Sequence, residues 1–142
     1  LAGDGPDARE LESLAHKLGV ADRVRFLGWR TDIADLMATA DMLVCPSRIE
    51  PLGNVVIEAW ARRLPVVAAA SEGPGWLIAD GEDGLLAPVE DYRALAAAIS
   101  RLAGDGQLAT RMADAGHARF EAEFTESPVV AKFLDLFDRV AG

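Results

Sequence analysis

The chain has 142 residues, of which 51% are hydrophobic and 26% are charged, and its formal net charge at pH 7 is −9. This length and balance are typical of one folded domain with a real core, and they exclude a chain that is mainly disordered. The negative charge disfavours nucleic acid and anionic membrane surfaces as partners.

The chain contains one cysteine, Cys45, which excludes an intrachain disulfide and fits a reducing compartment. No apolar run reaches the roughly 20 residues that a membrane-spanning helix needs. The start of the chain, Leu1 to Pro6, has neither an initiator Met nor a signal-peptide pattern. This start predicts that the chain is a piece of a longer protein.

In the first 40 residues the spacing of apolar side chains predicts short strands and helices. Leu1-Ala2 is expected to be the end of a strand, and Asp7 to Leu18 a helix. Alternating charged and apolar residues from Arg23 to Leu27 predict a second short strand. Thr31 is expected to cap a short helix that follows.

In the middle of the chain, apolar runs of strand length alternate with helical spacing. The predicted strands are Asp41–Cys45, Val66–Ala69 and Gly84–Leu86. The connections between them are predicted as a helix at 54–62, a loop at 73–75 and one helical turn at 76–79. Strands that alternate with helices favour a parallel sheet covered on both faces.

Amphipathic helices are predicted in the last third of the chain, at Asp91–Leu102, Gln107–Phe124 and Ser127–Val140. The last two are expected to pack on the domain through two apolar stripes. These stripes are Leu108, Met112 and Ala115, and Val130, Phe133, Leu134 and Phe137. The predicted fold class is therefore α/β, a Rossmann-like parallel sheet flanked by helices with a helical C-terminal tail, in one domain over residues 1–142.

A glycine-rich turn, Gly3-x-Gly5-x-x-Ala8, lies between an expected strand and a helix, where a dinucleotide-binding fingerprint would lie. That fingerprint requires an acidic residue about 20 residues further on. Trp29 and Arg30 follow the next expected strand instead, and Arg30 would suit a 2′-phosphate. A nicotinamide-dinucleotide site and a plain tight turn at a helix start both stay open.

A second motif combines Glu50, in the loop after an apolar strand, with Glu58, about one turn into the next helix. The same spacing separates Glu82 from Glu90, so the context and not the spacing carries the argument. Gly53 allows close backbone approach, and the amides of the first helical turn favour an anion. The segment therefore predicts a phosphate position flanked by two carboxylates that accept hydrogen bonds from hydroxyls. The alternative is a solvated Glu50 and a Glu58 that stabilises the helix start by its charge.

Residues 40–69, ADMLVCPSRIEPLGNVVIEAWARRLPVVAA, resemble the signature of retaining group 1 glycosyltransferases with the GT-B fold. This group includes mannosyltransferases, glucosyltransferases and the glycogen and sucrose synthases. The flanks agree, with VRFLG at 24–28 and ADGEDGLLAP at 79–88, and the resemblance covers roughly residues 1–120. It implies the C-terminal, donor-binding domain of a two-domain enzyme.

The resemblance also implies roles for individual residues. Glu50 matches the glutamate that contacts the donor sugar, and is the candidate catalytic residue, and Glu58 matches the one that holds the ribose hydroxyls. The backbone near the sugar and diphosphate, and the loops that line the nucleotide, match Leu52, Gly53, Asn54, Gly3, Gly28, Trp29 and Arg30. Arg48, beside Glu50, is the best basic candidate inside the site, and a salt bridge with a nearby carboxylate is its alternative role.

Two departures from the family pattern are visible. Arg63 stands where the family usually has the glycine that ends the helix, so the helix is expected to end differently. Glu72-Gly73 and Trp76 stand where the family tends to have a Gly-Gly pair and a glutamate. The family's basic pair for the diphosphate and its acceptor domain would lie upstream of residue 1.

The predicted function is the donor-domain part of a glycosyltransferase that moves a sugar from a nucleoside-diphosphate sugar to an acceptor, with retention. No Asp-x-Asp motif is present, which favours a scheme without a metal or other cofactor. The acceptor, a sugar or lipid-linked glycan, would bind the missing domain, and the chain alone is expected to be inactive. The expected location is cytoplasmic, with the inner membrane face as a second possibility. A nicotinamide-dependent oxidoreductase domain and a non-catalytic binding module of the same fold are the alternatives.

Overall fold

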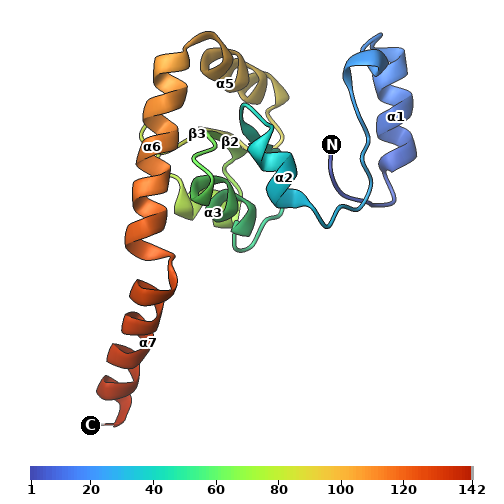
Figure 1. Cartoon of the computed structure of the whole chain (residues 1–142). Helices are drawn as coiled ribbons and strands as arrows, with labels where there is room; N and C mark the ends of the chain where they lie inside the picture. Colours follow the sequence, from blue (N-terminus) through green and yellow to red (C-terminus); the bar gives the residue numbers. More distant parts are fainter. Residues whose placement is uncertain (142) are drawn as a thin grey trace. The chain divides into compact units, whose positions relative to one another are not determined.

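The computed structural model describes residues 1–141, which form two compact units, residues 1–36 and residues 37 onward (Figure 1). The first unit contains α1 (Ala8–Lys17), the 3-10 helix η1 (Ala21–Arg23) and the start of α2 (Ile33–Ala38). The second contains the sheet and the remaining helices. The expectation of one domain over residues 1–142 stays a prediction.

Backbone pairing joins the start of the chain to the segment before Gly28, although neither forms a regular strand. The Leu1 amine donates to the Arg25 carbonyl at 2.7 Å, and the Leu27 amide donates to the Leu1 carbonyl at 2.9 Å. The next bond is donated by the Gly3 amide to the Gly28 carbonyl at 2.8 Å, whereas in a regular parallel pair the Leu27 carbonyl would accept it. The strands expected at Leu1-Ala2 and Arg23–Leu27 are therefore wrong as regular strands, because the pairing is too short.

The start of α2 also differs from expectation. The helix begins at Ile33, and the amides of Asp35 and Leu36 both donate to the Asp32 carbonyl. Asp32 therefore precedes the first helical turn, one residue later than the cap expected at Thr31.

The second unit is built on a parallel sheet of β1 (Leu43–Cys45), β2 (Val66–Ala69) and β3 (Leu85–Ala87), in that spatial order. Leu43 pairs with Val66, and Val67 pairs with Leu85. All of β2 is buried, as a central strand covered on both faces should be. The predicted α/β class with a parallel sheet is confirmed.

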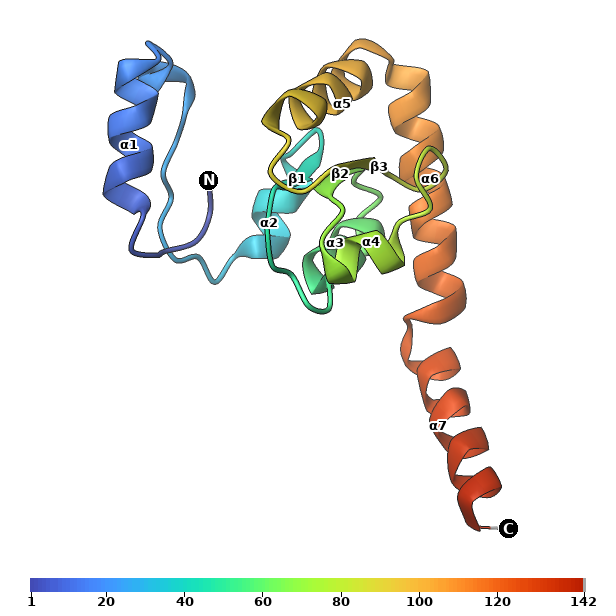
Figure 2. The ribbon, with the colours of Figure 1, turned by 180° about the vertical axis from the view of Figure 1, so that it is seen from behind.

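Helices cover both faces of this sheet. They are α3 (Asn54–Ala61), α4 (Glu72–Leu77), α5 (Tyr92–Gly104) and α6 (Gly106–Glu123), and α7 (Glu126–Ala141) follows α6 at the end of the chain. Figures 1 and 2 show α5 on one side of the sheet and α3 and α4 on the other, with α6 alongside. The loop expected at 73–75 and the helical turn expected at 76–79 are wrong, because α4 takes in both Gly-Pro-Gly and Trp76.

Alternation along β2 divides the core between the two faces. On the α5 side, Val67 packs in a buried cluster with one side chain from β3, one from α5 and two from α6, namely Leu85, Leu102, Leu108 and Met112. In α3, Trp60 is fully buried, and its indole nitrogen donates to the Asp83 carbonyl at 3.0 Å. A Cβ at Gly116 would lie 2.2 Å from the Trp60 ring, so α6 needs a glycine to pass this close to α3.

The C-terminal end of α3 keeps the geometry that a glycine usually provides. The Arg63 amide donates to the Trp60 carbonyl and the Leu64 amide to the Ala59 carbonyl, both at 3.0 Å. These are the two hydrogen bonds of a Schellman motif, and Arg63 has the left-handed φ of 53° that the motif requires. The expectation that the helix ends differently is therefore wrong, and Arg63 pairs with Asp114 of α6 at 2.7 Å.

The two tail helices behave differently. In α6 the buried residues are Leu108, Met112, Ala113 and Gly116, so Ala115, which is exposed, was wrongly placed in the stripe. In α7 the apolar stripe is exposed, with exposed fractions of 55% for Phe133, 58% for Leu134 and 62% for Phe137. The prediction that α7 packs on the domain is therefore wrong, because these three residues are exposed. Within residues 1–141, no helix has the length and apolarity needed to cross a membrane.

Candidate functional site

The carboxyl ends of the strands lie at one edge of the sheet, and each is followed by a connecting segment. The segment after β1 runs from residue 46 to residue 53 and leads into α3. The segment after β2 is only two residues long and leads into α4. In parallel sheets ligands bind at this edge, so the predicted residues between Arg48 and Glu58 occupy the expected place in the fold.

Glu50 is the residue that organises the loop after β1. Its Oε1 accepts a hydrogen bond from the Gly53 amide at 3.0 Å, and its carbonyl accepts one from the Gly73 amide at 2.7 Å. The side chain is partly buried, and its Oε2 makes no hydrogen bond within residues 1–141. The carboxylate is thus held at one oxygen, while the other can accept a hydrogen bond from a ligand.

Two glycines allow the loop and α4 to approach each other closely. A Cβ on Gly73 would lie 2.5 Å from the Gly53 nitrogen and 2.5 Å from the Leu52 carbonyl carbon. Gly53 has a φ of 73°, and a Cβ there would lie 2.8 Å from Cδ1 of Leu77. On the side where a Gly53 Cβ would lie, the space is therefore filled by α4.

Gly53 immediately precedes α3, whose first turn begins at Asn54. Leu52, Asn54 and Glu58 are all exposed, and Leu52 has an exposed fraction of 69%. Glu58 lies one turn into the helix, so its carboxylate and the amides of the first turn lie at the same end of α3. A negatively charged group at that end would be favoured by the helix dipole.

Arg48 forms an ion pair that links two of these connecting segments. Its Nη1 lies 3.3 Å from Oε1 of Glu90, which follows β3, and both side chains are largely exposed. The alternative role of Arg48 as a salt-bridge partner is thus the one present in the structure. Glu82 and Glu90, the equally spaced pair, are both exposed, and Glu90 but not Glu82 bonds to a predicted site residue, Arg48.

The remaining predicted residues belong to the first unit. Gly3 and Gly28 have positive φ values of 126° and 61°, are joined by a hydrogen bond and line a hollow of about 530 Å³ within that unit. Trp29 has an exposed fraction of 79%. Arg30 holds Asp32 through two parallel hydrogen bonds, one of them 2.7 Å from Nε to Oδ1.

This Arg30–Asp32 pair affects the ionisation of both groups. The hydrogen bond from Arg30 lowers the pKa of the Asp32 carboxyl below its ordinary value, and the same bond raises the pKa of Arg30. Both groups are therefore charged at neutral pH, and the guanidinium that was predicted to line the nucleotide is engaged by a carboxylate of its own unit.

Three features of the second unit were missed by sequence reasoning. The closest approach in the loop depends on Gly73, which appeared only as a departure from a family pattern. Ser71, at the end of the segment after β2, is 5% exposed, and its Oγ has no hydrogen-bond partner within the described chain. Arg119 of α6 contacts the last residue of α4, and nothing in its local sequence indicates this.

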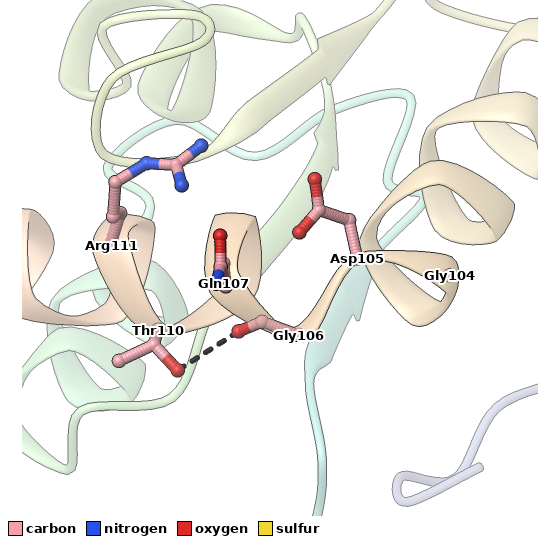
Figure 3. Close-up of a pocket in the computed structure, with 6 residues that line it drawn as sticks. All are labelled: Gly104, Asp105, Gly106, Gln107, Thr110 and Arg111. Atoms are coloured by element: carbon pink, nitrogen blue, oxygen red, sulfur yellow. Dashed lines mark hydrogen bonds between the residues drawn. The ribbon is translucent and has the colours of Figure 1, made fainter.

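A large open hollow lies at the α5–α6 junction, and Figure 3 shows the residues that line it. Asp105 caps α6 by accepting a hydrogen bond from the Leu108 amide at 2.9 Å, and the Thr110 hydroxyl donates to the Gly106 carbonyl at 2.9 Å. Asp105 is thus used to cap α6 and the Thr110 hydroxyl bonds within the same helix, and none of the predicted site residues lines this hollow.

Comparison with known proteins identifies the family of the chain. Residues 1–105 match the family model "Glycosyl transferases group 1". The chain is 42% identical over 136 residues to the lipopolysaccharide core biosynthesis glycosyltransferase LpsE of Rhizobium meliloti (strain 1021). The matched segment covers 96% of this chain and 40% of LpsE.

Solved structures of Anabaena Alr3699/HepE have the same fold. The complex with UDP has a TM-score of 0.91 and 30% identity over 98% of this chain and 40% of that one. The complex with UDP-glucose has a TM-score of 0.89 and 31% identity, over 98% and 40%. The chain therefore spans about two-fifths of the length of these relatives. On the family match and these similarities, the chain belongs to the group 1 glycosyl transferases.

Proposed function

We propose that this chain is the donor-binding part of a glycosyltransferase that uses a uridine-diphosphate sugar. The observation that carries the proposal is the turn from Glu50 to Gly53, which places the start of α3 and one free carboxylate oxygen at the carboxyl edge of the sheet. The UDP and UDP-glucose bound by Anabaena HepE support this choice of nucleotide.

In this proposal different residues contact different parts of the donor. The exposed Glu58 accepts hydrogen bonds from the ribose hydroxyls, and the first turn of α3 faces the diphosphate. Glu50 accepts a hydrogen bond from the donor sugar through Oε2. The sugar and diphosphate pass the backbone of Leu52, Gly53 and Asn54, with Arg48 beside them. For the first unit by itself, the proposal is that Gly3, Gly28, Trp29 and Arg30 line a nucleotide.

The reaction breaks the bond between the anomeric carbon of the sugar and an oxygen of the diphosphate. Negative charge grows on the leaving diphosphate in the transition state, and fixed amide donors at a helix start stabilise that charge. The proposed reaction retains the anomeric configuration and needs no metal ion or organic cofactor. The transferred group is a hexose.

The acceptor, a sugar or a lipid-linked glycan, would bind a part of the full-length protein outside residues 1–142. The isolated chain is therefore proposed to bind the donor without transferring its sugar. The proposed location is cytoplasmic, where nucleoside-diphosphate sugars would be supplied, and attachment to the inner membrane face would involve the rest of the protein.

Calorimetric titration of the chain with UDP, UDP-glucose and NADPH tests the proposal. UDP and UDP-glucose should bind and NADPH should not. Binding of NADPH alone would favour the nicotinamide-dependent alternative, whereas a full-length protein that binds none of the three would overturn the proposal.

A further inference from the structure

Arg119 lies on α6, and its guanidinium contacts several other elements. Its Nη1 donates to the Leu77 carbonyl and also lies 3.0 Å from Oδ2 of Asp83. Its Nε lies 3.3 Å from Oε1 of Glu123, and its guanidinium carbon lies 5.4 Å from the centre of the Trp60 ring. The planar guanidinium is thus held on several sides at once.

The partner carboxylate is buried and fully used. The Asp83 side chain is 7% exposed, and its Oδ1 accepts a hydrogen bond from the Ala79 amide at 2.8 Å. A buried ion pair with each oxygen hydrogen-bonded defines one geometry sharply, because either charge left alone would be costly. Arg119 and Asp83 therefore fix where the chain leaves α4.

The contact with Leu77 transmits this constraint to α4. Leu77 is the last residue of that helix, and its carbonyl is one of those without a partner inside the helix. α4 has only six residues, too few to be stable by itself, so its position depends on the contacts at its two ends.

The other end of α4 contacts the loop that carries Glu50. Gly73 donates to the Glu50 carbonyl at 2.7 Å. The side chain of Leu77, from the end of α4 that Arg119 contacts, reaches the same loop, because its Cδ1 occupies the space where a Cβ of Gly53 would lie. A continuous series of contacts therefore runs from Arg119 through α4 to Gly53 and Glu50.

We propose that Arg119 is a positioning residue for the donor loop: acting through α4, it holds Glu50 and Gly53 in the conformation that receives the sugar of the donor, without touching the donor itself. This inference rests on the proposed function for the identity of the ligand. The link from Arg119 to the loop does not depend on it.

The test compares Arg119→Lys with Arg111→Lys in the full-length protein. Arg111 lies on the same helix and is exposed, and its side chain makes no hydrogen bond or ion pair within the described chain, so it controls for the substitution itself. Lysine keeps the charge beside Asp83 but cannot reproduce the planar fork that also binds the Leu77 carbonyl.

The first measurement is amide hydrogen exchange, which needs no ligand. In Arg119→Lys the amides of Gly53 and Gly73 should exchange about tenfold faster, while that of Leu43, bonded to the Pro65 carbonyl at the start of β1, keeps its rate. Arg111→Lys should change none of these rates. Unchanged exchange at both glycines, or an equal rise at Leu43, would overturn the inference.

The second measurement is titration with UDP and UDP-glucose. Arg119→Lys should weaken UDP-glucose about tenfold and leave UDP within about twofold, because the loop contacts the sugar. Equal weakening of both ligands would contradict the positioning role. If the wild-type protein bound neither ligand but the glycine amides still responded, the proposed function would fail and the link through α4 would stand.

Discussion

The backbone amide of Gly73 donates a hydrogen bond to the carbonyl oxygen of Glu50 at 2.7 Å, and this bond ties the short helix α4 to the loop after β1. The two segments are more than 20 residues apart in sequence but touch at the backbone, because neither Gly53 nor Gly73 has a side chain. One side of the candidate donor loop therefore packs against the backbone of α4 and does not face solvent.

Gly73→Ala should separate the loop from α4. The new Cβ would meet backbone atoms at 2.5 Å, so the backbone must move, and we expect the free energy of unfolding to fall by about 1–3 kcal/mol. Gly104→Ala is the matched control, since a Cβ at Gly104 meets nothing within 4 Å. Urea unfolding of both variants measures the difference. Equal stability of the two variants would contradict the described contact.

Arg63 supplies a second prediction, about the end of α3. Its left-handed φ of 53° costs a non-glycine residue about 1–2 kcal/mol, while its exposed ion pair with Asp114 contributes at most about 1 kcal/mol. We expect Arg63→Gly to be more stable than Arg63→Ala by about 1 kcal/mol, because both lose the ion pair and only glycine relieves the strain. Thermal unfolding of the two variants decides, with Asp114→Ala reporting the ion pair alone. A more stable alanine variant would rule out the left-handed conformation.

Ser71 precedes α4 as a helix cap would, but its hydroxyl makes no capping hydrogen bond. Removal of a buried hydroxyl without a partner is neutral or stabilising, so Ser71→Ala should change the free energy of unfolding by less than about 0.5 kcal/mol or raise it. Asp91 accepts hydrogen bonds from the amides of Arg93 and Ala94, and Asp91→Ala should cost about 1 kcal/mol. If the two variants lost equal stability in urea unfolding, Ser71 would be a functioning cap.

The exposed stripe of α7 predicts self-association of the isolated chain. Phe133 and Phe137 lie with their ring centres 6.4 Å apart, and contiguous exposed apolar side chains favour contacts between molecules. We expect the sedimentation coefficient of the wild-type chain to rise with concentration, and the Phe133→Ser/Phe137→Ser variant to stay monomeric. Lys132→Ser, on the same helix, should behave like the wild type. A wild-type chain that is monomeric at every concentration would refute this prediction.

The three strands of the sheet and most helices could be predicted because their patterns are local. The buried run Val66–Ala69 and the periodic apolar residues of α5 and α6 determine their own conformation. The loop at 73–75 was predicted wrongly because Gly-Pro-Gly is typical of turns, whereas here the glycines serve a close approach that only the tertiary structure shows. The role of Arg119 could not be predicted for the same reason, because it depends on contacts with residues 36 and 42 positions away in the sequence.

Other errors came from patterns that do not specify a partner. The stripe on α7 correctly indicated an apolar face, but periodicity cannot say what covers that face. Arg63 was expected to change the end of α3, yet the two Schellman hydrogen bonds outweigh its conformational preference. For Glu50, sequence context placed the residue at the sheet edge but could not show that its carboxylate already binds the Gly53 amide.

That bond determines which glutamate variants should be compared. Glu50→Gln keeps an oxygen that can accept from Gly53, so it tests the contact with the sugar without releasing the loop. Glu82→Ala is the better control of the equally spaced pair, because the other member, Glu90, bonds to the predicted site residue Arg48.

The most direct test of the donor site is calorimetric titration of Glu58→Ala, Glu50→Gln and Glu82→Ala with UDP and UDP-glucose. Hydrogen bonds to a charged acceptor contribute about 1.5–3 kcal/mol, so Glu58→Ala should weaken both ligands about 10- to 150-fold. Glu50→Gln should weaken UDP-glucose and spare UDP, and Glu82→Ala should change neither affinity. Unchanged UDP affinity in Glu58→Ala, or an equal loss in Glu82→Ala, would mean that the donor does not bind at the start of α3.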